Sequence, residues 1–190
     1  MPLQNPKLFM LLLGCKPPGR HTEQHDVFFG IAPSLKELVP SVHAFWPEAK
    51  KNLHLDAWRE VTSVQQYTIC ARLKTETTVD LKEHTLFFIN LGGYRKNEFE
   101  EYHYKILVVA KDLTAAILQA KQQLFYKETG FKGASAHIDD KYGIDVDEAY
   151  AVENILPKEM AAVYTLDIMQ SQGNAEDPFQ LGYMPLWKIK

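Results

Sequence analysis

Short apolar segments separated by polar loops predict the β-strands of this chain. Residues 7–13 and 86–91 are rich in Leu, Phe and Ile, and a glycine follows each of them, as is typical of buried strands. Residues 27–32 and 105–110 have the same character after a polar loop. Each half of the chain is therefore predicted to begin with two strands. Further extended segments are expected at 58–64, 67–73, 142–146, 150–155, 162–169 and 181–189.

A helix is expected after each pair of strands. In the second half, apolar residues with helical spacing form one stripe that ends before Gly130. The stripe consists of Leu113, Ala116, Ile117, Ala120 and Leu124. Ser34 and Asp112 stand where the two helices would begin, and both residue types cap helix N-termini. The first helix should break near Pro40 and end by Pro47, because proline removes a helical hydrogen bond.

The two halves align with each other at a constant offset of 78 residues. Seven positions between 9–35 and 87–113 are identical without a gap, where ordinary residue frequencies would give about one or two. The identical pairs are Phe9/Phe87, Leu13/Leu91, Gly14/Gly92, Glu23/Glu101, His25/His103, Ala32/Ala110 and Leu35/Leu113. A second block, residues 54–56, aligns with residues 137–139 at an offset of 83, which places five extra residues in the loop near 129–133. The sequence therefore predicts an internal duplication.

The order of these elements predicts an α+β fold. We expect a tandem duplication of a β-β-α-β(-β) unit with pseudo-twofold symmetry, in which the copies span residues 1–78 and 79–157. Each copy is near the small end for an independent core, so packing of one copy on the other would stabilise both. Residues 158–190 have no counterpart in the repeat, and their two expected strands predict a C-terminal β-hairpin extension that covers a sheet edge.

Two short polar pairs recur in each half: Glu-x-His before the second strand, and His-x-Asp after the helix. Residues i and i+2 of an extended chain point to the same face, so each pair can present an imidazole beside a carboxylate. The eight candidate residues are Glu23, His25, His54, Asp56, Glu101, His103, His137 and Asp139.

Three roles for these residues are open at the level of sequence. The pairs can hydrogen-bond to each other or to loop backbone and so fix the fold. They can hold a metal, because imidazole and carboxylate together suit zinc or non-haem iron. They can serve as general acid or base, because a carboxylate orients an imidazole and makes it more basic. Neither a catalytic residue nor a metal is assigned at this stage.

Composition and charge narrow the classes of partner. The 190 residues are 46% hydrophobic and 24% charged, as in globular proteins, and the net charge of -3 without a basic run argues against a nucleic-acid partner. The apolar run at 8–13 is far shorter than the roughly 20 residues that span a bilayer, so no membrane partner is expected. Cys15 and Cys70 form no CxxC pair, which favours a reducing cytoplasm over a disulfide framework.

These observations favour a binding or interaction module whose cleft lies between the two repeats. Its partner would be an unidentified ligand or protein, with a homo-oligomer left open. The alternative is a metal-dependent or general acid/base enzyme that uses the Glu-x-His and His-x-Asp residues. No phosphate-binding loop or dinucleotide fingerprint is present in the sequence, so we expect no organic cofactor.

Four features of the first copy occur together: the Leu-Gly step, the Glu-x-His pair, the capped helix and His-Leu-Asp-x-Trp. In these features the chain resembles a bacterial family known as domain of unknown function 1543. Its domain occurs once or twice per chain, and with both copies counted the resemblance spans most of residues 7–155. The second copy has Lys141 where the first has Trp58, so it resembles the family less closely. The resemblance agrees with a duplication and a cytoplasmic location, and it implies no activity.

Overall fold

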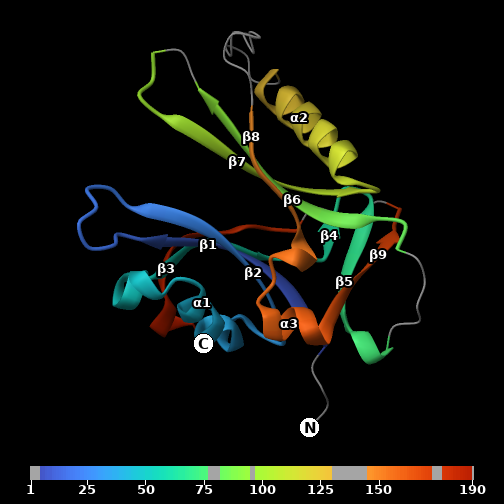
Figure 1. The fold of residues 1–190 in the computed structure, drawn as a ribbon, viewed down its shortest axis with the longest axis horizontal. Helices are drawn as coiled ribbons and strands as arrows, with labels where there is room; N and C mark the ends of the chain where they lie inside the picture. Colours follow the sequence, from blue (N-terminus) through green and yellow to red (C-terminus); the bar gives the residue numbers. More distant parts are fainter. Residues whose placement is uncertain (1–4, 77–81, 95–96, 130–144, 173–176, 190) are drawn as a thin grey trace. The chain divides into compact units, whose positions relative to one another are not determined.

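The computed structural model describes residues 5–76, 82–94, 97–129, 145–172 and 177–189, which form a mixed α+β structure (Figure 1). They fall into two compact units. Unit 1 comprises residues 1–80 together with 155–190, and unit 2 comprises residues 81–154. No helix among the described residues is long and apolar enough to cross a membrane.

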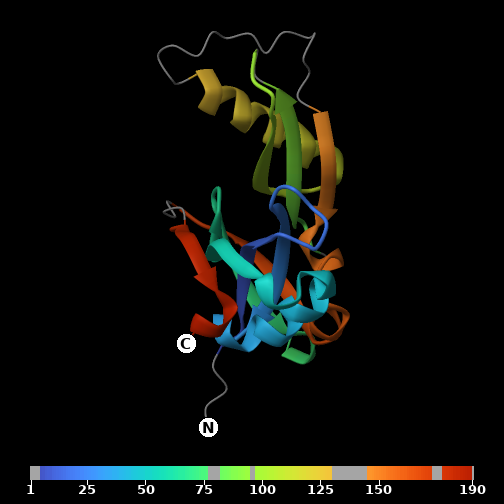
Figure 2. The same cartoon turned by 90° about the vertical axis from the view of Figure 1, so that its left-hand side faces the viewer.

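Unit 2 is a three-stranded antiparallel sheet with one helix on it. The elements are β6 (Thr85–Tyr94), β7 (Glu101–Ala110), α2 (Leu113–Thr129) and β8 (Asp145–Ala151), and the strand order is β7-β6-β8. α2 lies across one face of the sheet (Figures 1 and 2) and buries Ala116 and Ala120 against it. The Asp112 carboxylate accepts a hydrogen bond from the Ala115 backbone N–H at 2.8 Å, as expected of an N-cap.

Unit 1 contains two antiparallel sheets. The first is built from β1 (Lys7–Cys15), β2 (Gln24–Ala32), β3 (His54–Glu60) and β10 (Gln180–Pro185), in the order β10-β3-β1-β2. The second is built from β4 (Ser63–Val64), β5 (Tyr67–Leu73) and β9 (Tyr164–Gln170), in the order β4-β5-β9.

The helical segment that follows β2 is broken, as the prolines predict. A 3-10 turn, η1 (Leu35–Leu38), precedes α1 (Val39–Phe45), which carries Pro40 in its first turn, and η2 (Pro47–Asn52) follows. Ser34 does not cap this segment: its hydroxyl hydrogen-bonds the Glu37 carboxylate at 3.0 Å instead of a backbone N–H. The remaining helical elements are η3 (Lys74–Glu76), η4 (Val152–Asn154), α3 (Lys158–Val163) and η5 (Leu186–Lys188).

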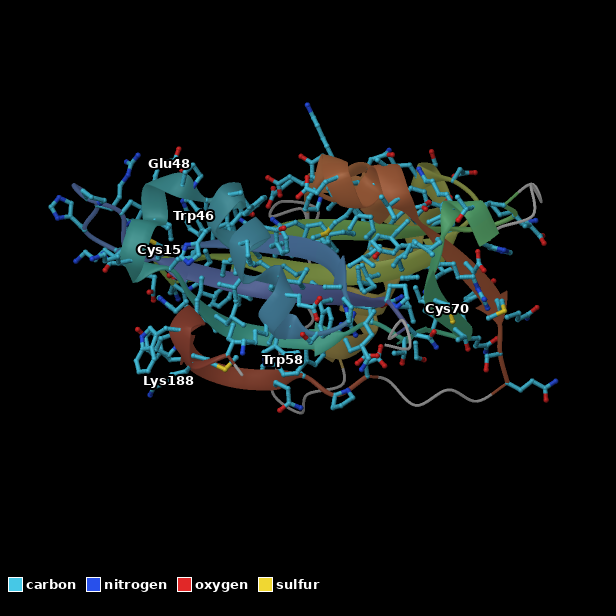
Figure 3. All side chains as sticks on the ribbon, turned by 90° about the horizontal axis from the view of Figure 1, so that it is seen from below. Cys15, Trp46, Glu48, Trp58, Cys70 and Lys188 are labelled. Atoms are coloured by element: carbon cyan, nitrogen blue, oxygen red, sulfur yellow. The ribbon has the colours of Figure 1, made fainter. Side chains whose placement is uncertain are left out.

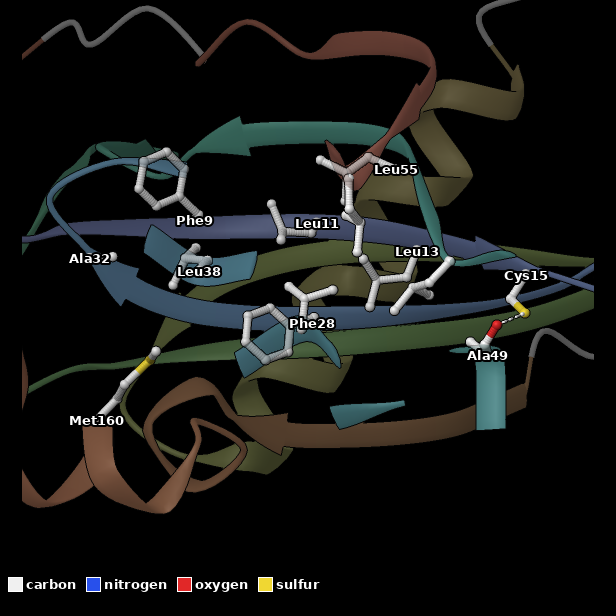
Figure 4. Close-up of a cluster of buried hydrophobic side chains, with 13 residues drawn as sticks. Phe9, Leu11, Leu13, Cys15, Phe28, Ala32, Leu38, Ala49, Leu55 and Met160 are labelled. Atoms are coloured by element: carbon white, nitrogen blue, oxygen red, sulfur yellow. Dashed lines mark hydrogen bonds between the residues drawn. The ribbon is translucent and has the colours of Figure 1, made fainter. Parts of the chain in front are cut away.

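The core of unit 1 lies on one face of the first sheet. The odd-numbered residues of β1 from Phe9 to Cys15 point into it, because successive residues of a strand alternate between faces. Leu38 and Val42 from the broken helix and Met160 from α3 pack onto the same face (Figure 4). The even-numbered residues of β1, which include Gly14, therefore face the other side of the sheet.

The expected C-terminal hairpin is wrong. β9 pairs along its whole length with β5, whereas β10 pairs with β3 in the other sheet. Each of these strands completes a sheet begun by the N-terminal half of unit 1, so residues 158–190 are an integral part of that unit. A hydrophobic pattern identifies such strands but not their partners, because strand pairing over long sequence distances depends on the tertiary structure.

The two cysteines of unit 1 are far apart, as Figure 3 shows, and both are free thiols. Cys15 ends β1 and is fully buried, and its Sγ donates a hydrogen bond to the Ala49 carbonyl at 3.6 Å. Burial, with a smaller contribution from the negative charge of Glu23, raises the pKa of the Cys15 thiol. Both effects disfavour the reactive thiolate.

Candidate functional site

Gly14 is the centre of the candidate site, because both neighbours of β1 place a histidine opposite it. β2 pairs His25 with Gly14, and β3 pairs His54 with the same glycine. Leu13 and Cys15 point into the core, so Gly14 and the residues around it face the opposite side of the sheet. The sheet register thus brings together two histidines that lie far apart in the sequence.

A β-bulge adds a carboxylate to these histidines. The pairing of β1 with β3 shifts at one point, where Leu13 pairs with Leu55 but Leu12 pairs with Ala57. Asp56 is the extra residue on β3, and a bulge of this kind redirects a side chain. Glu23, immediately before β2, supplies a second carboxylate.

The site depends on the absence of a side chain at Gly14. A Cβ atom there would lie 2.2 Å from Oδ2 of Asp56 and 2.4 Å from Nε2 of His54, which is far inside van der Waals contact. Both polar atoms therefore occupy the space that any other residue would fill. Close approach of this kind is a reason for glycine that has nothing to do with backbone flexibility.

The four side chains form one cluster. Nε2 of His25 lies 3.2 Å from Oδ2 of Asp56 and 3.8 Å from Oε2 of Glu23. Nε2 of His54 lies 3.0 Å from Oε1 of Glu23 and 3.4 Å from Oδ1 of Asp56. Two ligands of one ion, each at about 2.1 Å, are about 3.0 Å apart at a right angle and about 3.4 Å apart at the tetrahedral angle. Three of the four separations fall in this range, and the 3.8 Å between His25 and Glu23 corresponds to a wider angle of about 130°.

His54 is the buried member of the cluster, with only 5% of its surface exposed. Its Nδ1 lies 2.9 Å from the backbone carbonyl of Asn52. A carbonyl can only accept, so Nδ1 carries the hydrogen of this contact, and the other ring nitrogen, Nε2, is directed toward the site. The Tyr183 ring of β10 packs on the imidazole at a centroid distance of 4.4 Å.

Two atoms of this cluster are buried without a hydrogen bond: Nε2 of His54 and Oδ2 of Asp56. Nε2 is close to carboxylate oxygens, but these contacts do not have hydrogen-bond geometry. Buried polar atoms are nearly always satisfied, so an unsatisfied pair at one point requires an explanation. His25 and Glu23, with side chains 44% exposed, form the solvent side of the cluster.

Unit 2 has a smaller cluster around Gly92. β7 pairs His103 with Gly92, and a Cβ atom on this glycine would lie 2.6 Å from Oδ2 of Asp147. Nε2 of His103 lies 3.4 Å from Asp147 and 4.0 Å from Glu101. β8 places Asp145 opposite Gly92, at the register position that His54 has in unit 1.

The sequence alignment and the structure agree on the hairpin of unit 2. The other two candidates of this half, His137 and Asp139, lie outside the described residues and stay predictions. Gly92 pairs with Asp145 on β8, as Gly14 pairs with His54 on β3. These two partners are 91 residues apart in the sequence, whereas the sequence alignment used an offset of 83 for this segment. Asp147, which the sequence reasoning missed, has the place that Asp56 has in unit 1. Asp147 could have been found from the Asp-x-Asp spacing of residues 145 and 147, if β6 is given the register shift that β1 has in unit 1.

Tyr94 lies at the edge of the cluster in unit 2. It ends β6 opposite Glu101. A hydrogen bond to Glu101 raises the pKa of the Tyr94 phenol, and burial and the negative charges of Glu101 and Asp147 add to this effect. Its ionisation therefore reports on the charge of the cluster.

Comparison with known proteins gives a structural relative and a partial family match. Among curated proteins, none matches the chain significantly. A solved structure, a protein Il1583 from Idiomarina loihiensis, is similar over 96% of this chain and 99% of its own, with 25% sequence identity and a TM-score of 0.58. The model of the family "Domain of Unknown Function (DUF1543)" matches residues 20–71, the segment that supplies Glu23, His25, His54 and Asp56.

Proposed function

We propose that unit 1 binds divalent transition metal through the side chains of Glu23, His25, His54 and Asp56. The observation that carries this proposal is the environment of His54: its buried Nε2 lies beside carboxylate oxygens and makes no hydrogen bond. A buried nitrogen and buried anionic oxygens without hydrogen bonds are costly, and a cation that both coordinate would satisfy them. Metal bound at the cluster would satisfy both Nε2 and the buried Oδ2 of Asp56.

The surroundings of His54 also support a metal. Histidines that bind metals almost always donate their other ring N–H to a carbonyl or carboxylate, which fixes the tautomer and the ring orientation. Nδ1 of His54 makes this contact with the Asn52 carbonyl, and Tyr183 packs on the ring. The imidazole is thereby held in one orientation with Nε2 toward the carboxylates.

The ligand types indicate which ions fit. Imidazole nitrogens and carboxylate oxygens together suit zinc, manganese and ferrous iron, whereas sites for calcium and magnesium are built from oxygen alone. Cys15, although adjacent in sequence to Gly14, points into the core and hydrogen-bonds Ala49. Its thiol is therefore directed away from the cluster.

We also propose that units 1 and 2 are copies of one ancestral repeat. This is supported by the offset of 78, at which the β1–β2 and β6–β7 pairings coincide residue by residue. It is further supported by the shared strand order and by the glycine with a histidine opposite it in each unit. A pseudo-twofold relation between the copies and a cleft between them remain predictions from the sequence, as does a binding module that uses such a cleft.

A second candidate function, general acid/base catalysis, is favoured by His25. Its imidazole is partly exposed and lies 3.2 Å from Oδ2 of Asp56 and 3.8 Å from Glu23. Carboxylates beside an exposed imidazole orient it for proton transfer. We further propose a cytoplasmic location, supported by the two free thiols.

Equilibrium dialysis of the purified chain against Zn²⁺ or Mn²⁺, followed by elemental analysis, tests the metal proposal. We expect wild type to retain metal and the Glu23→Gln/Asp56→Asn double variant to lose it from unit 1. The matched control is Glu60→Gln/Asp167→Asn, which removes two carboxylates of the same unit that form ion pairs with Lys7 and Arg72. Equal metal content in wild type and the first variant would refute the proposal.

A further inference from the structure

The two imidazoles of unit 1 approach different oxygens of the same two carboxylates. His25 lies beside Oε2 of Glu23 and Oδ2 of Asp56, at 3.8 Å and 3.2 Å. His54 lies beside Oε1 of Glu23 and Oδ1 of Asp56, at 3.0 Å and 3.4 Å. Each carboxylate therefore stands between the rings with one oxygen toward each of them.

A single ion does not account for this arrangement. Ligands that share an ion at about 2.1 Å are at most about 4.2 Å apart. Among the described residues, Glu23, His25 and Asp56 offer donor atoms that all lie within 4.8 Å of one another, and His54 is not in that group. The donors of one set thus lie around His25, and His54 instead contacts the opposite oxygens of the same two carboxylates.

We infer that the cluster holds two divalent cations, one beside each imidazole, bridged by the carboxylates of Glu23 and Asp56. This inference rests on the proposed function of metal binding. The first ion takes Nε2 of His25 with Oε2 and Oδ2, and the second takes Nε2 of His54 with Oε1 and Oδ1. Ions that share ligands in two-metal sites are about 3.5–4 Å apart.

The two positions differ in their access to solvent. The side chain of His25 is 44% exposed, so the ion beside it keeps room for water or a ligand oxygen. The side chain of His54 is 6% exposed and lies beneath the Tyr183 ring, so the ion beside it is the enclosed one. We therefore expect the His54 position to release its ion more slowly than the His25 position.

Counting bound Mn²⁺ tests the inference, in a background with Glu101→Gln and Asp147→Asn so that unit 2 contributes no ion. Elemental analysis gives the number of ions, and electron paramagnetic resonance shows whether they are close enough to couple. We expect two ions per chain with a coupled spectrum. His25→Ala should reduce this to one uncoupled ion, and His54→Ala should do the same.

The outcomes separate this inference from the proposed function. One uncoupled ion in the background chain would overturn the two-ion site and leave metal binding intact. No bound ion, with Zn²⁺ in place of Mn²⁺ as well, would overturn both. Two ions that do not couple would contradict the shared carboxylates. Because His25 is on the surface, His25→Ala tests the inference even if His54→Ala does not fold.

Discussion

The clusters of the two units share a design but differ in one residue that decides their chemistry. Each has a glycine on the central strand, a histidine opposite it, a glutamate two residues before that histidine, and an aspartate on the third strand. The distances from histidine to aspartate are 3.2 Å in unit 1 and 3.4 Å in unit 2. Unit 1 adds a buried histidine, His54, where unit 2 has Asp145 in register.

The surrounding strands, and not the shared motif, create the buried environment of His54 in unit 1. β10 lies beside β3 and brings Tyr183 onto the His54 ring. In unit 2, β8 is the edge of the sheet among the described residues. The side chains of His103 and Glu101 are about as exposed, at 40% and 41%, as those of His25 and Glu23, at 44%. The same hairpin motif is therefore open in both units, and unit 1 differs by the enclosed His54.

The largest effect is expected from Gly14→Ala. The new methyl group would occupy the space of Oδ2 of Asp56 and Nε2 of His54, and the His54 ring is buried and held by the Asn52 carbonyl and the Tyr183 ring. We expect the affinity of unit 1 for Zn²⁺ to fall by about 100-fold or more, and the free energy of unfolding of the metal-free chain to fall by about 1–3 kcal/mol. Isothermal titration calorimetry and denaturant unfolding measure the two quantities.

Gly92→Ala is the matched control for that prediction. Its methyl group would displace only Asp147 in unit 2. The affinity of unit 1 should therefore remain that of wild type. An equal loss of Zn²⁺ affinity at unit 1 in both glycine variants would show that the effect of Gly14→Ala is not local.

Exchanging the residue types of His54 and Asp145 should make the metal preference of each unit more like that of the other. His54→Asp gives unit 1 the residue type that unit 2 has at the same register position. We expect Zn²⁺ affinity to fall by about 10- to 100-fold with less effect on Mn²⁺, because imidazole favours zinc and carboxylate favours manganese. Asp145→His should strengthen Zn²⁺ binding in unit 2. Competition with a chromogenic chelator measures both, and an unchanged preference between Zn²⁺ and Mn²⁺ would contradict the role of His54.

A smaller effect is expected at Tyr94, which reports on unit 2 alone. Its phenol pKa is raised from its ordinary value of 10.0, chiefly by the hydrogen bond to Glu101. Glu101→Gln should therefore lower the pKa of Tyr94, and a cation bound at the cluster should lower it too. Ultraviolet titration of wild type against Tyr94→Phe isolates this residue. A pKa that does not respond to Glu101→Gln would show that Glu101 is not the cause.

The smallest effect, on the pH dependence of stability, is expected at Cys15. Unit 2 has no cysteine at the equivalent position, 78 residues later, which is Gly93. The pKa of Cys15 is raised above 9.0 in the folded chain. The fold therefore binds this proton more tightly than the unfolded chain does, so the resulting stability is present below pH 9 and lost as the pH rises further. The difference in unfolding free energy between wild type and Cys15→Ala should shrink from pH 7 to pH 10, and a constant difference would contradict this.

The sequence predicted the hairpins of both units because their signal is local. Gly14 and His25 face each other across one short connection, and the same pair recurs at an offset of 78 as Gly92 and His103. The helix α2 and the break at Pro40 were predictable for the same reason, since helical spacing and proline chemistry act within one segment.

The third strand and the C-terminal strands could not be predicted in this way. Asp56 reaches the site through a bulge, and the choice between Asp139 and Asp147 depends on a register that residue identity does not reveal. The burial of His54 depends partly on Tyr183, more than a hundred residues away in the sequence. Such contacts follow from the tertiary fold and leave no periodic pattern in the chain.

The most direct test of metal binding in unit 1 is an anomalous difference map from crystals of the chain grown with Mn²⁺. We expect a strong peak above Gly14, within about 2.2 Å of Nε2 of His54 and of oxygens from Glu23 and Asp56. A map without a peak there, in which His54 and Asp56 are instead satisfied by hydrogen bonds to each other or to water, would contradict it.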